Sequence, residues 1–474
     1  MESNPFVVVG ADAAGLSAAS KCRRVDPDRE VIVFEKGRWI SYAYCGMPYF
    51  IEGRIDQLSD LLSLSPAEAD DRGIDLRRGH EVTGVDPDAS VVTVDADGET
   101  IEQPYSDLLI ATGGRATTGP FDVRDLDGAF TLHNMDAAAA IDAYIAAPEA
   151  YDEERIADTP ADRDRVAHNA EQPAPKTAAI VGGGYVGVEM AEALRGRGLD
   201  VHLFQRSGHV LQPFGQAVAD RVEAELDAKG VHVHTDSPVE ELVGNDRIEA
   251  ISYDGGRQPV DLAVVGVGIK PNTGLVAETD IEFGAGGAIA TDEYGRTNLP
   301  DVYAAGDCAT ARHTVTGEPT WMPLGLTANR GGRAIGATVA GESEPIGDIA
   351  GTAVVKAFDL ECGRVGLVDA DEARAAGFDP IRKTITAGSR SGYYPGGAET
   401  DVTLVADRET GRLLGGTIVG ADRAAVRINT LATALESGLT VAEVERLDLA
   451  YAPPFSPVWD PVLVAAKVLG GALS

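Results

Sequence analysis

The sequence predicts an α/β fold with two Rossmann-like units, followed by an α+β region. An apolar strand meets a glycine-rich turn and a helical segment twice, in FVVVGADAAGLSAAS from residue 6 and in TAAIVGGGYVGVEMAEAL from residue 177. From about residue 350, GTAVVKAFDL and VTLVADRETGRLLGGTIVG alternate apolar strands with turn residues, and INTLATALESG follows with helical spacing. The length of 474 residues leaves room for roughly two to four domains.

The first unit has the spacing of a dinucleotide-binding βαβ motif. Gly10 would make the tight turn, and Gly15 would let the helix pack closely on the strand. About 20 residues later the strand VIVFEK ends at Glu35, which can bond a ribose hydroxyl. Asp12 replaces the middle glycine of the GxGxxG pattern. Taken alone, this turn is therefore compatible with either a nucleotide site or an ordinary strand-to-helix connection.

The second unit completes the glycine pattern with Gly182, Gly184 and Gly187. Its next strand, VHLF, ends at Gln205 and Arg206, where an NAD site usually places an acid for the 2′-hydroxyl. A neutral residue followed by arginine favours NADPH over NADH, because the guanidinium can pair with the 2′-phosphate. The alternative is that Arg206 is a solvated surface residue.

Two further motifs extend this pattern. YSDLLIATGGR (105–115) is a short strand that ends in Thr112-Gly113-Gly114, and DVYAAGDCA (301–309) runs into Gly306-Asp307. The order of the four motifs resembles that of the FAD-dependent pyridine nucleotide-disulfide oxidoreductases. The resemblance implies that the first unit binds FAD, that the second binds NADPH or NADH, and that Asp307 bonds the ribityl chain of the flavin.

The resemblance also implies individual contact residues. For FAD these are Gly10, Ala14, Gly15, Glu35, Lys36, Val82, Thr112, Gly113, Gly306 and Asp307. For NAD(P)H they are Gly182, Gly184, Tyr185, Val186, Gly187, Glu189, Gln205, Arg206 and Gly268.

A domain plan comes from the same resemblance. It divides the chain into a discontinuous FAD-binding domain (1–120 and 285–345), an NAD(P)H-binding domain (121–284) and a dimerisation domain (350–474). The segment 147–176 is acidic, punctuated by proline and without apolar periodicity. We expect it to be a surface insertion or a mobile loop.

Cys45, in SYAYCGMPY, is the predicted redox residue. It has no CxxxxC partner, and the last histidine of the chain is His313, so a dithiol mechanism with a C-terminal histidine is excluded. A lone cysteine beside a flavin can form a mixed disulfide or cycle through sulfenic acid. The motif resembles the single-cysteine subgroup that contains coenzyme A-disulfide reductases, NADH oxidases and NADH peroxidases. The oxidases and peroxidases place a histidine where this chain has Ala13, which favours the coenzyme A-disulfide type.

The remaining cysteines, Cys22, Cys308 and Cys362, are expected to be small buried side chains.

In that subgroup, tyrosines of the partner subunit approach the cysteine from YAPP and YYPG segments. Here these are Tyr451 and the pair Tyr393-Tyr394, of which either could face the sulfur. A phenol can donate a hydrogen bond to a thiolate leaving group. The alternative is that these tyrosines are aromatic residues buried in a Pro-rich interface. Tyr44 and Trp459 depart from residues common in the subgroup, which leaves the exact disulfide open.

Contacts to coenzyme A are implied at Ser17, Lys21, Arg24, Ser41 and Asn329.

The composition is strongly acidic, with 75 acidic against 40 basic residues and a formal net charge of -35. Such a chain repels nucleic acid and anionic membranes, and we interpret the charge as adaptation to high salt. The sequence has neither a membrane-spanning apolar run nor a basic leader, so a cytoplasmic protein is expected. His232 and His234 alternate on one strand without a third ligand spaced nearby, so no metal site is expected.

The sequence therefore predicts a homodimeric flavoprotein that reduces a low-molecular-weight disulfide, most simply coenzyme A disulfide, with NAD(P)H through FAD and Cys45. Two alternatives stay open. One is an NAD(P)H oxidase or peroxidase, or a persulfide reductase, that uses Cys45 as sulfenic acid or persulfide. The other is an electron-transfer flavoprotein that serves a protein partner.

Overall fold

The computed structural model describes residues 4–123 and 126–473, and its first sheet is built mainly from the N-terminal part of this chain. The sheet has five parallel strands in the order β18-β7-β1-β2-β3. They are β1 (Phe6–Val9), β2 (Val31–Glu35), β3 (Asp75–Arg78), β7 (Asp107–Ile110) and β18 (Val302–Ala304). The central strands are continuous apolar runs because helices and loops cover both faces of the sheet.

A second parallel sheet repeats this plan in the order β12-β11-β10-β16-β9. Its strands are β9 (Ala129–Phe130), β10 (Thr177–Val181), β11 (Asp200–Phe204), β12 (Val231–His234) and β16 (Leu262–Val265). In each unit a three-stranded antiparallel sheet is inserted before the strand that returns to the centre. These small sheets are β4 (His80–Asp86), β5 (Val91–Ala96) and β6 (Glu99–Pro104), and β13 (Val239–Gly244), β14 (Ile248–Tyr253) and β15 (Gly256–Pro259).

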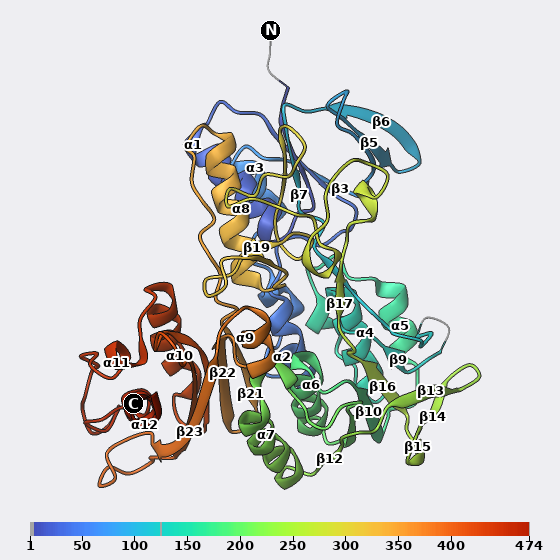
Figure 1. The fold of residues 1–474 in the computed structure, drawn as a ribbon. Coiled ribbons are helices and arrows are strands. Elements are labelled where there is room, and N and C mark those ends of the chain that lie inside the picture. Colours follow the sequence, from blue (N-terminus) through green and yellow to red (C-terminus); the bar gives the residue numbers. More distant parts are fainter. Residues whose placement is uncertain (1–3, 124–125, 474) are drawn as a thin grey trace.

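The C-terminal region is an antiparallel sheet covered by helices, at the lower left of Figure 1. Its strand order is β21-β22-β25-β24-β23. The elements are β21 (Ala353–Ala357), β22 (Leu360–Gly366), β23 (Pro380–Gly388), β24 (Glu399–Asp407), β25 (Leu413–Gly420), α10 (Ala424–Glu436), α11 (Val441–Val444) and α12 (Pro461–Leu473). Two Rossmann-like sheets and this α+β region confirm the predicted fold class.

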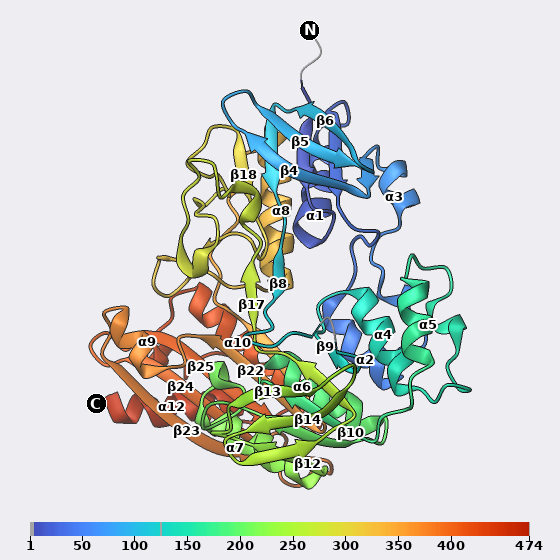
Figure 2. The same ribbon diagram turned by 90° about the vertical axis from the view of Figure 1, so that its right-hand side faces the viewer.

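Two antiparallel strands, β8 (Gly114–Ala116) and β17 (Ile269–Pro271), run between the upper and lower parts of the molecule in Figure 2. No helix of the described chain is long and apolar enough to cross a bilayer.

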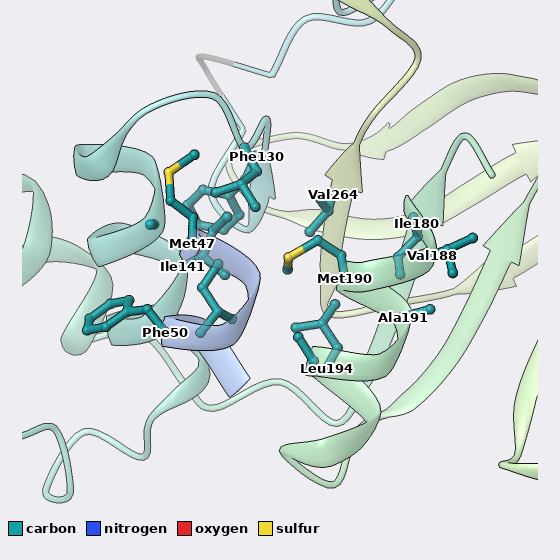
Figure 3. Packing of buried hydrophobic residues seen from close by; sticks show 14 of the residues in the cluster. Met47, Phe50, Phe130, Ile141, Ile180, Val188, Met190, Ala191, Leu194 and Val264 are labelled. Atoms are coloured by element: carbon teal, nitrogen blue, oxygen red, sulfur yellow. The ribbon is translucent and has the colours of Figure 1, made fainter. Parts of the chain in front are cut away.

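The segment that follows Cys45 is anchored in the core of the second unit. Helix α2 (Met47–Glu52) packs between α4 (Met135–Ile145) and α6 (Tyr185–Gly196). Met47 and Phe50 of α2 and Met190 and Leu194 of α6 belong to one hydrophobic cluster (Figure 3). All four of these side chains are buried. Because Cys45 lies two residues before α2, this packing holds the cysteine at the junction of the two units.

The segment 147–176 is folded, so the alternative of a mobile loop is wrong. It contains the short helix α5 (Arg163–Ala170), and its apolar residues Ile156, Ala161 and Val166 are buried in the same cluster as α4. Arg155 donates a 2.7 Å hydrogen bond to Asp142 of α4, whose side chain is only 1% exposed. The buried residues are spaced five apart, which is neither a helical nor a strand period, so the sequence pattern gave no sign of this packing.

Two helices of the first unit cross in close contact next to the candidate site. Helices α1 (Ala13–Val25) and α8 (Gly325–Val339) meet at Gly332 and Gly336. A Cβ atom on Gly332 would lie 2.0 Å from the backbone oxygen of Ala14, and one on Gly336 would lie 2.2 Å from that of Ala18. The two backbones therefore touch, and polar side chains of both helices flank the contact.

Candidate active site

The two glycine turns have the same geometry. A Cβ atom on Gly15 would lie 1.8 Å from the backbone oxygen of Gly10, and one on Gly187 would lie 1.8 Å from that of Gly182. Both helices therefore start directly against their strands, and the N–H groups of a first helical turn have no partner within the helix. A Cβ atom on Gly184 would meet nothing within 4 Å, which leaves open space at the start of α6. Each turn is shaped to receive the pyrophosphate of a dinucleotide.

Equivalent side chains brace the two turns. In the first unit, Glu35 accepts hydrogen bonds from the backbone of Ala11 at 3.0 Å and of Gly37 at 2.7 Å. In the second unit, Gln205 accepts one from the backbone of Gly183 at 3.0 Å. The acid of the first unit is thus replaced by an amide in the second, and the next residue, Arg206, is exposed.

Asp12 fits into the first turn although it replaces a glycine. Its φ of -119° is an extended conformation that any residue adopts. Burial raises the pKa of its carboxyl group to about 7, although hydrogen bonds from Tyr44 and from the backbone of Tyr42 oppose the shift. Near neutral pH, Asp12 is therefore partly uncharged, which reduces its repulsion of a bound pyrophosphate.

The predicted flavin contacts gather where β7 and β18 end. Asn272 donates hydrogen bonds to the backbone oxygens of Thr112 at 3.0 Å and of Gly114 at 2.9 Å, which fixes the turn after β7. Asp307 lies next to this turn. Burial raises the pKa of its carboxyl group, while the charge of His133 acts in the opposite direction. Of the other predicted contacts, Ala14 and Val82 are buried, Lys36 is exposed, and Gly113 and Gly306 have positive φ.

Cys45 is the exposed cysteine among four free ones. It lies in the short helix η1 (Tyr44–Gly46), whereas Cys22, Cys308 and Cys362 are each 0% exposed, as predicted. Desolvation by the surrounding protein raises the pKa of the Cys45 thiol, and the negative charge of Glu189 raises it further. In the single chain, the thiol is therefore accessible, but its surroundings disfavour the thiolate form.

The carboxyl group of Glu189 is the charged group that acts on Cys45. It lies on α6 and accepts a 3.2 Å hydrogen bond from the hydroxyl group of Tyr49. Burial raises the pKa of Glu189 to about 7. Tyr185 and Val186 begin the same helix, so the N-terminal half of α6 adjoins the nucleotide turn and carries the carboxyl group that acts on Cys45.

An aromatic stack stands next to the cysteine. The Tyr44 ring stacks on Tyr42 with a centroid separation of 4.4 Å and lies 5.8 Å from the ring of His133. His133 is held by a 2.8 Å hydrogen bond to the backbone oxygen of Gly114. The ring at position 44 therefore connects Cys45 to the turn that carries the predicted flavin contacts.

A cavity of about 330 Å³ opens between α1 and α8. All five side chains predicted to contact coenzyme A line it: Ser17, Lys21, Arg24, Ser41 and Asn329. Ser17 donates a 2.7 Å hydrogen bond to Asn329, which joins the two helices. Arg72 and Arg333, which the sequence analysis missed, bring the cations in the lining to four, and no acidic side chain is among the lining residues.

The tyrosines of the C-terminal region lie together on its surface. The hydroxyl groups of Tyr393 and Tyr451 are 3.4 Å apart, and these side chains are 76% and 47% exposed. Tyr394 is 38% exposed. Within the described residues, none of the three forms a hydrogen bond with Cys45 of the same chain.

Comparison with known proteins identifies the family. Residues 4–331 match the family model of the pyridine nucleotide-disulphide oxidoreductases, and residues 352–461 match the dimerisation domain of the same family. The chain belongs to this family. Its members typically use FAD and NAD(P)H, and the match to the dimerisation domain indicates a homodimer.

Relatives cover nearly the full chain. A protein of Pyrococcus horikoshii described as NAD(P)H coenzyme A polysulfide/persulfide reductase is 37% identical, over 98% of both chains. The coenzyme A disulfide reductase of Staphylococcus haemolyticus is 30% identical, over 95% of this chain and 96% of its own. The solved NAD-dependent persulfide reductase of A. fulgidus is 31% identical with a TM-score of 0.90, over 99% of this chain and 83% of its own.

The residues of this family member fit the two cofactors. The first turn with Glu35 and Asp307 would hold FAD, and the open space at Gly184 together with Gln205 would hold NAD(P)H. Gly268, with a φ of +122°, lies in the loop between β16 and β17. The sequence analysis missed Tyr49, His133 and Asn272, because their roles depend on contacts between distant elements and no local motif marks them.

Proposed function

We propose that this protein reduces a low-molecular-weight disulfide, with coenzyme A disulfide as the substrate, by using NAD(P)H, FAD and the thiol of Cys45. The observation that carries the proposal is the basic cavity between α1 and α8. It leads towards Ser41, four residues before the exposed Cys45. A single accessible thiol beside a phosphate-binding cavity suits a thiol substrate that carries a nucleotide.

The charge of the cavity supports this substrate. In a chain with a net charge of -35, a lining that contains Lys21, Arg24, Arg72 and Arg333 and no acid stands out. Guanidinium groups pair with phosphate oxygens in two-point geometry. Lys21 also lies 3.5 Å from Glu342, so a phosphate would compete with that acid for the ammonium group.

The chemistry of the proposed reaction centres on Cys45. Its thiolate attacks the substrate disulfide, forms a mixed disulfide and releases one coenzyme A thiolate, which is then protonated. FAD, when bound, would supply two electrons from NAD(P)H, and their addition to the mixed disulfide would give the Cys45 thiolate and a second coenzyme A thiolate. One hydride and one proton are consumed for two thiols formed.

We further propose that the site is completed by a second subunit. Tyr393 and Tyr451 share one exposed patch and form no hydrogen bond with Cys45 of their own chain among the described residues. In a homodimer, a partner's phenol could donate a hydrogen bond to the departing thiolate and lower its basicity. Because its hydroxyl group is close to that of Tyr451, Tyr393 is favoured over Tyr394 as the inward residue.

Persulfides and polysulfides of coenzyme A are a second candidate substrate class. The descriptions of the Pyrococcus horikoshii and A. fulgidus proteins support it, because both name persulfide reduction. The same basic cavity and thiol would serve, since these substrates share the nucleotide and differ only in the sulfur that is attacked. An oxidase or peroxidase is less favoured because Ala13 offers no proton donor.

The remaining parts of the proposal concern cofactor choice and organisation. Gln205 and Arg206 support NADPH as the preferred donor. The proposed domains are 1–120 with 285–345 for FAD, 121–284 for NAD(P)H and 350–474 for dimerisation. The four free cysteines suit a protein of the reducing cytoplasm.

The test compares the wild-type protein with Cys45→Ser. Turnover is measured with coenzyme A disulfide, coenzyme A persulfide, cystine, hydrogen peroxide and oxygen, each with NADH and with NADPH. We expect the variant to lose disulfide reduction while it retains bound FAD and transfers electrons to an artificial dye. Full activity of Cys45→Ser with any of these sulfur substrates would contradict the thiol mechanism and favour an electron-transfer flavoprotein.

Two arginine variants separate coenzyme A disulfide from other disulfides. Arg24→Gln and Arg333→Gln should each raise KM for coenzyme A disulfide by about 10- to 100-fold, because each removes a charge-assisted hydrogen bond worth about 1.5 to 3 kcal/mol. KM for cystine, which has no phosphate, should stay unchanged. Arg257→Gln, an exposed arginine remote from this cavity, serves as the matched control. Equal effects on both substrates would contradict phosphate recognition.

A further inference from the structure

A cluster of imidazole and carboxylate side chains lies at the edge of the second sheet, outside the candidate active site. Strand β12 is the edge strand, and it runs parallel to β11 with His202 opposite His232. Asp200 and His202 are two residues apart on β11, as are His232 and His234 on β12, so each pair projects from one face of its strand. Four potential ligand side chains therefore meet on adjoining strands.

The distances within this cluster are short. Nε2 of His232 is 3.2 Å from Oδ1 of Asp200, and Nε2 of His202 is 3.7 Å from Oδ2 of the same carboxylate. One ligand atom from each of the three residues lies within 4.8 Å of the other two. In a tetrahedral site with bonds of about 2.0 to 2.1 Å, neighbouring ligand atoms are about 3.4 Å apart. Small rotations of the exposed Asp200 and His232 would reach that spacing.

His202 is already oriented as a ligand. Its side chain is 11% exposed, and its Nδ1 atom lies 3.1 Å from Nε2 of His234. With the proton on Nδ1 donated to His234, the lone pair of Nε2 points towards Asp200.

We propose that Asp200, His202 and His232 bind one divalent first-row transition-metal ion of the zinc type, with His234 orienting His202 and water filling the open position. Two imidazoles with one carboxylate suit such ions better than calcium or magnesium, which prefer oxygen ligands. Among the described residues, this is the one group of three or more such side chains with this spacing.

The proposed ion would tie the edge strand to the sheet. Asp200 and His202 lie on β11, and the nucleotide-facing Gln205 follows its end, about 10 to 17 Å away along an extended strand. The ion would therefore lie outside the predicted nucleotide contacts and act on the stability of the NAD(P)H-binding unit. The pair His232 and His234 gave no such prediction from sequence, because the other two ligands come from a different strand.

Zinc titration of the FAD-loaded dimer tests the site. Calorimetry in a Cys45→Ser background removes the exposed thiol as a competing ligand, and the expected stoichiometry is one Zn²⁺ per chain. His232→Gln and Asp200→Asn should each weaken binding by at least about 10-fold. Both side chains are half exposed, so these variants should fold normally. Zn²⁺ should also raise the melting temperature of the parent protein and leave that of His232→Gln unchanged.

The chain offers a matched control. His168 and Asp127 form another exposed pair, with Nε2 2.9 Å from Oδ1, but no third ligand among the residues that the structure describes completes it. His168→Gln should bind Zn²⁺ as the parent does. His234→Phe, which leaves the three ligands in place, should weaken binding by about 10- to 100-fold. Zinc uptake that is absent, that survives both His232→Gln and Asp200→Asn, or that falls equally in His168→Gln would overturn the proposal.

Discussion

The hydroxyl group of Tyr49 donates a 3.2 Å hydrogen bond to Oε1 of Glu189 and thereby links the helix that follows Cys45 to the N-terminal half of α6. The carboxylate it holds raises the pKa of the Cys45 thiol. The packing of α2 on α6 thus sets the reactivity of the sulfur as well as its position.

Removal of the Glu189 charge should make Cys45 more acidic. In Glu189→Gln, the thiolate loses a neighbouring anion, so its pKa falls and the rate of alkylation by iodoacetamide at pH 7 rises by several fold. Rates measured against pH give the thiol pKa directly, and Cys45→Ser provides the unlabelled baseline. In Tyr49→Phe, Glu189 loses a hydrogen bond that favours its charged form, so its own pKa should rise above about 7. An unchanged thiol pKa in Glu189→Gln would refute the electrostatic link.

FAD affinity should depend on pH through Asp12. The pKa of this carboxyl group is about 7, so above that pH it becomes a second anion beside the pyrophosphate. Binding coupled to the uptake of one proton weakens by up to about 10-fold per pH unit. Fluorescence titration of the apoprotein with FAD between pH 6 and pH 9 should show this loss in the wild type and a flatter profile in Asp12→Asn. Parallel profiles for the two proteins would assign the pH dependence to other groups.

Arg206 should discriminate between the two nicotinamide cofactors. We expect Arg206→Ala to raise KM for NADPH by about 10- to 100-fold, because one charge-assisted hydrogen bond is worth about 1.5 to 3 kcal/mol. KM for NADH should hardly change. Gln205→Glu should act in the opposite sense, because its carboxylate would repel the 2′-phosphate and bond the ribose hydroxyl. If Arg206→Ala affected both cofactors equally, Arg206 would be the solvated surface residue considered as the alternative.

The sequence was most informative where a function depends on residues close together in the chain. The glycine turns, the lone Cys45 and the helix face with Ser17, Lys21 and Arg24 could be predicted because spacing along a strand or helix determines where side chains lie. The presence of four basic side chains in the cavity lining could not be predicted, because Arg72 and Arg333 reach the cavity from elements other than the first helix.

Asp12 illustrates a second limit of sequence reasoning. The motif shows a carboxyl group in place of a glycine, but its partly neutral state depends on burial and on Tyr44, which lies 32 positions further along the chain. The segment 147–176 illustrates a third limit. Its acidic composition resembles that of a disordered region, yet three apolar residues spaced five apart and the hydrogen bond from Arg155 to Asp142 dock it on α4.

Hybrid dimers should show whether the tyrosines act across subunits. Cys45→Ser is inactive by design, and Tyr451→Phe should lose about 10- to 100-fold in kcat through the missing hydrogen bond to the leaving thiolate. When the two variants share a dimer, one site combines an intact Cys45 with the partner's intact Tyr451. Activity should then recover to about half that of the wild type, as one of two symmetric sites is restored. Without recovery, Tyr451 would act within its own chain or serve packing alone, and Tyr393→Phe in place of Tyr451→Phe tests the second phenol in the same way.

Salt should stabilise this protein. Acidic residues outnumber basic ones by 75 to 40, so the folded chain repels itself at low ionic strength. Raising KCl from about 0.1 M to about 1 M shortens the Debye length from about 10 Å to about 3 Å, which screens the acids from one another but leaves contact pairs such as Arg29 and Asp107 largely intact. We therefore expect the melting temperature to rise steadily over this range. Sorbitol at matched osmolality, which screens no charge, controls for general solute effects. Equal stability in dilute buffer and in concentrated KCl would contradict adaptation to high salt and leave the acidic surface without this explanation.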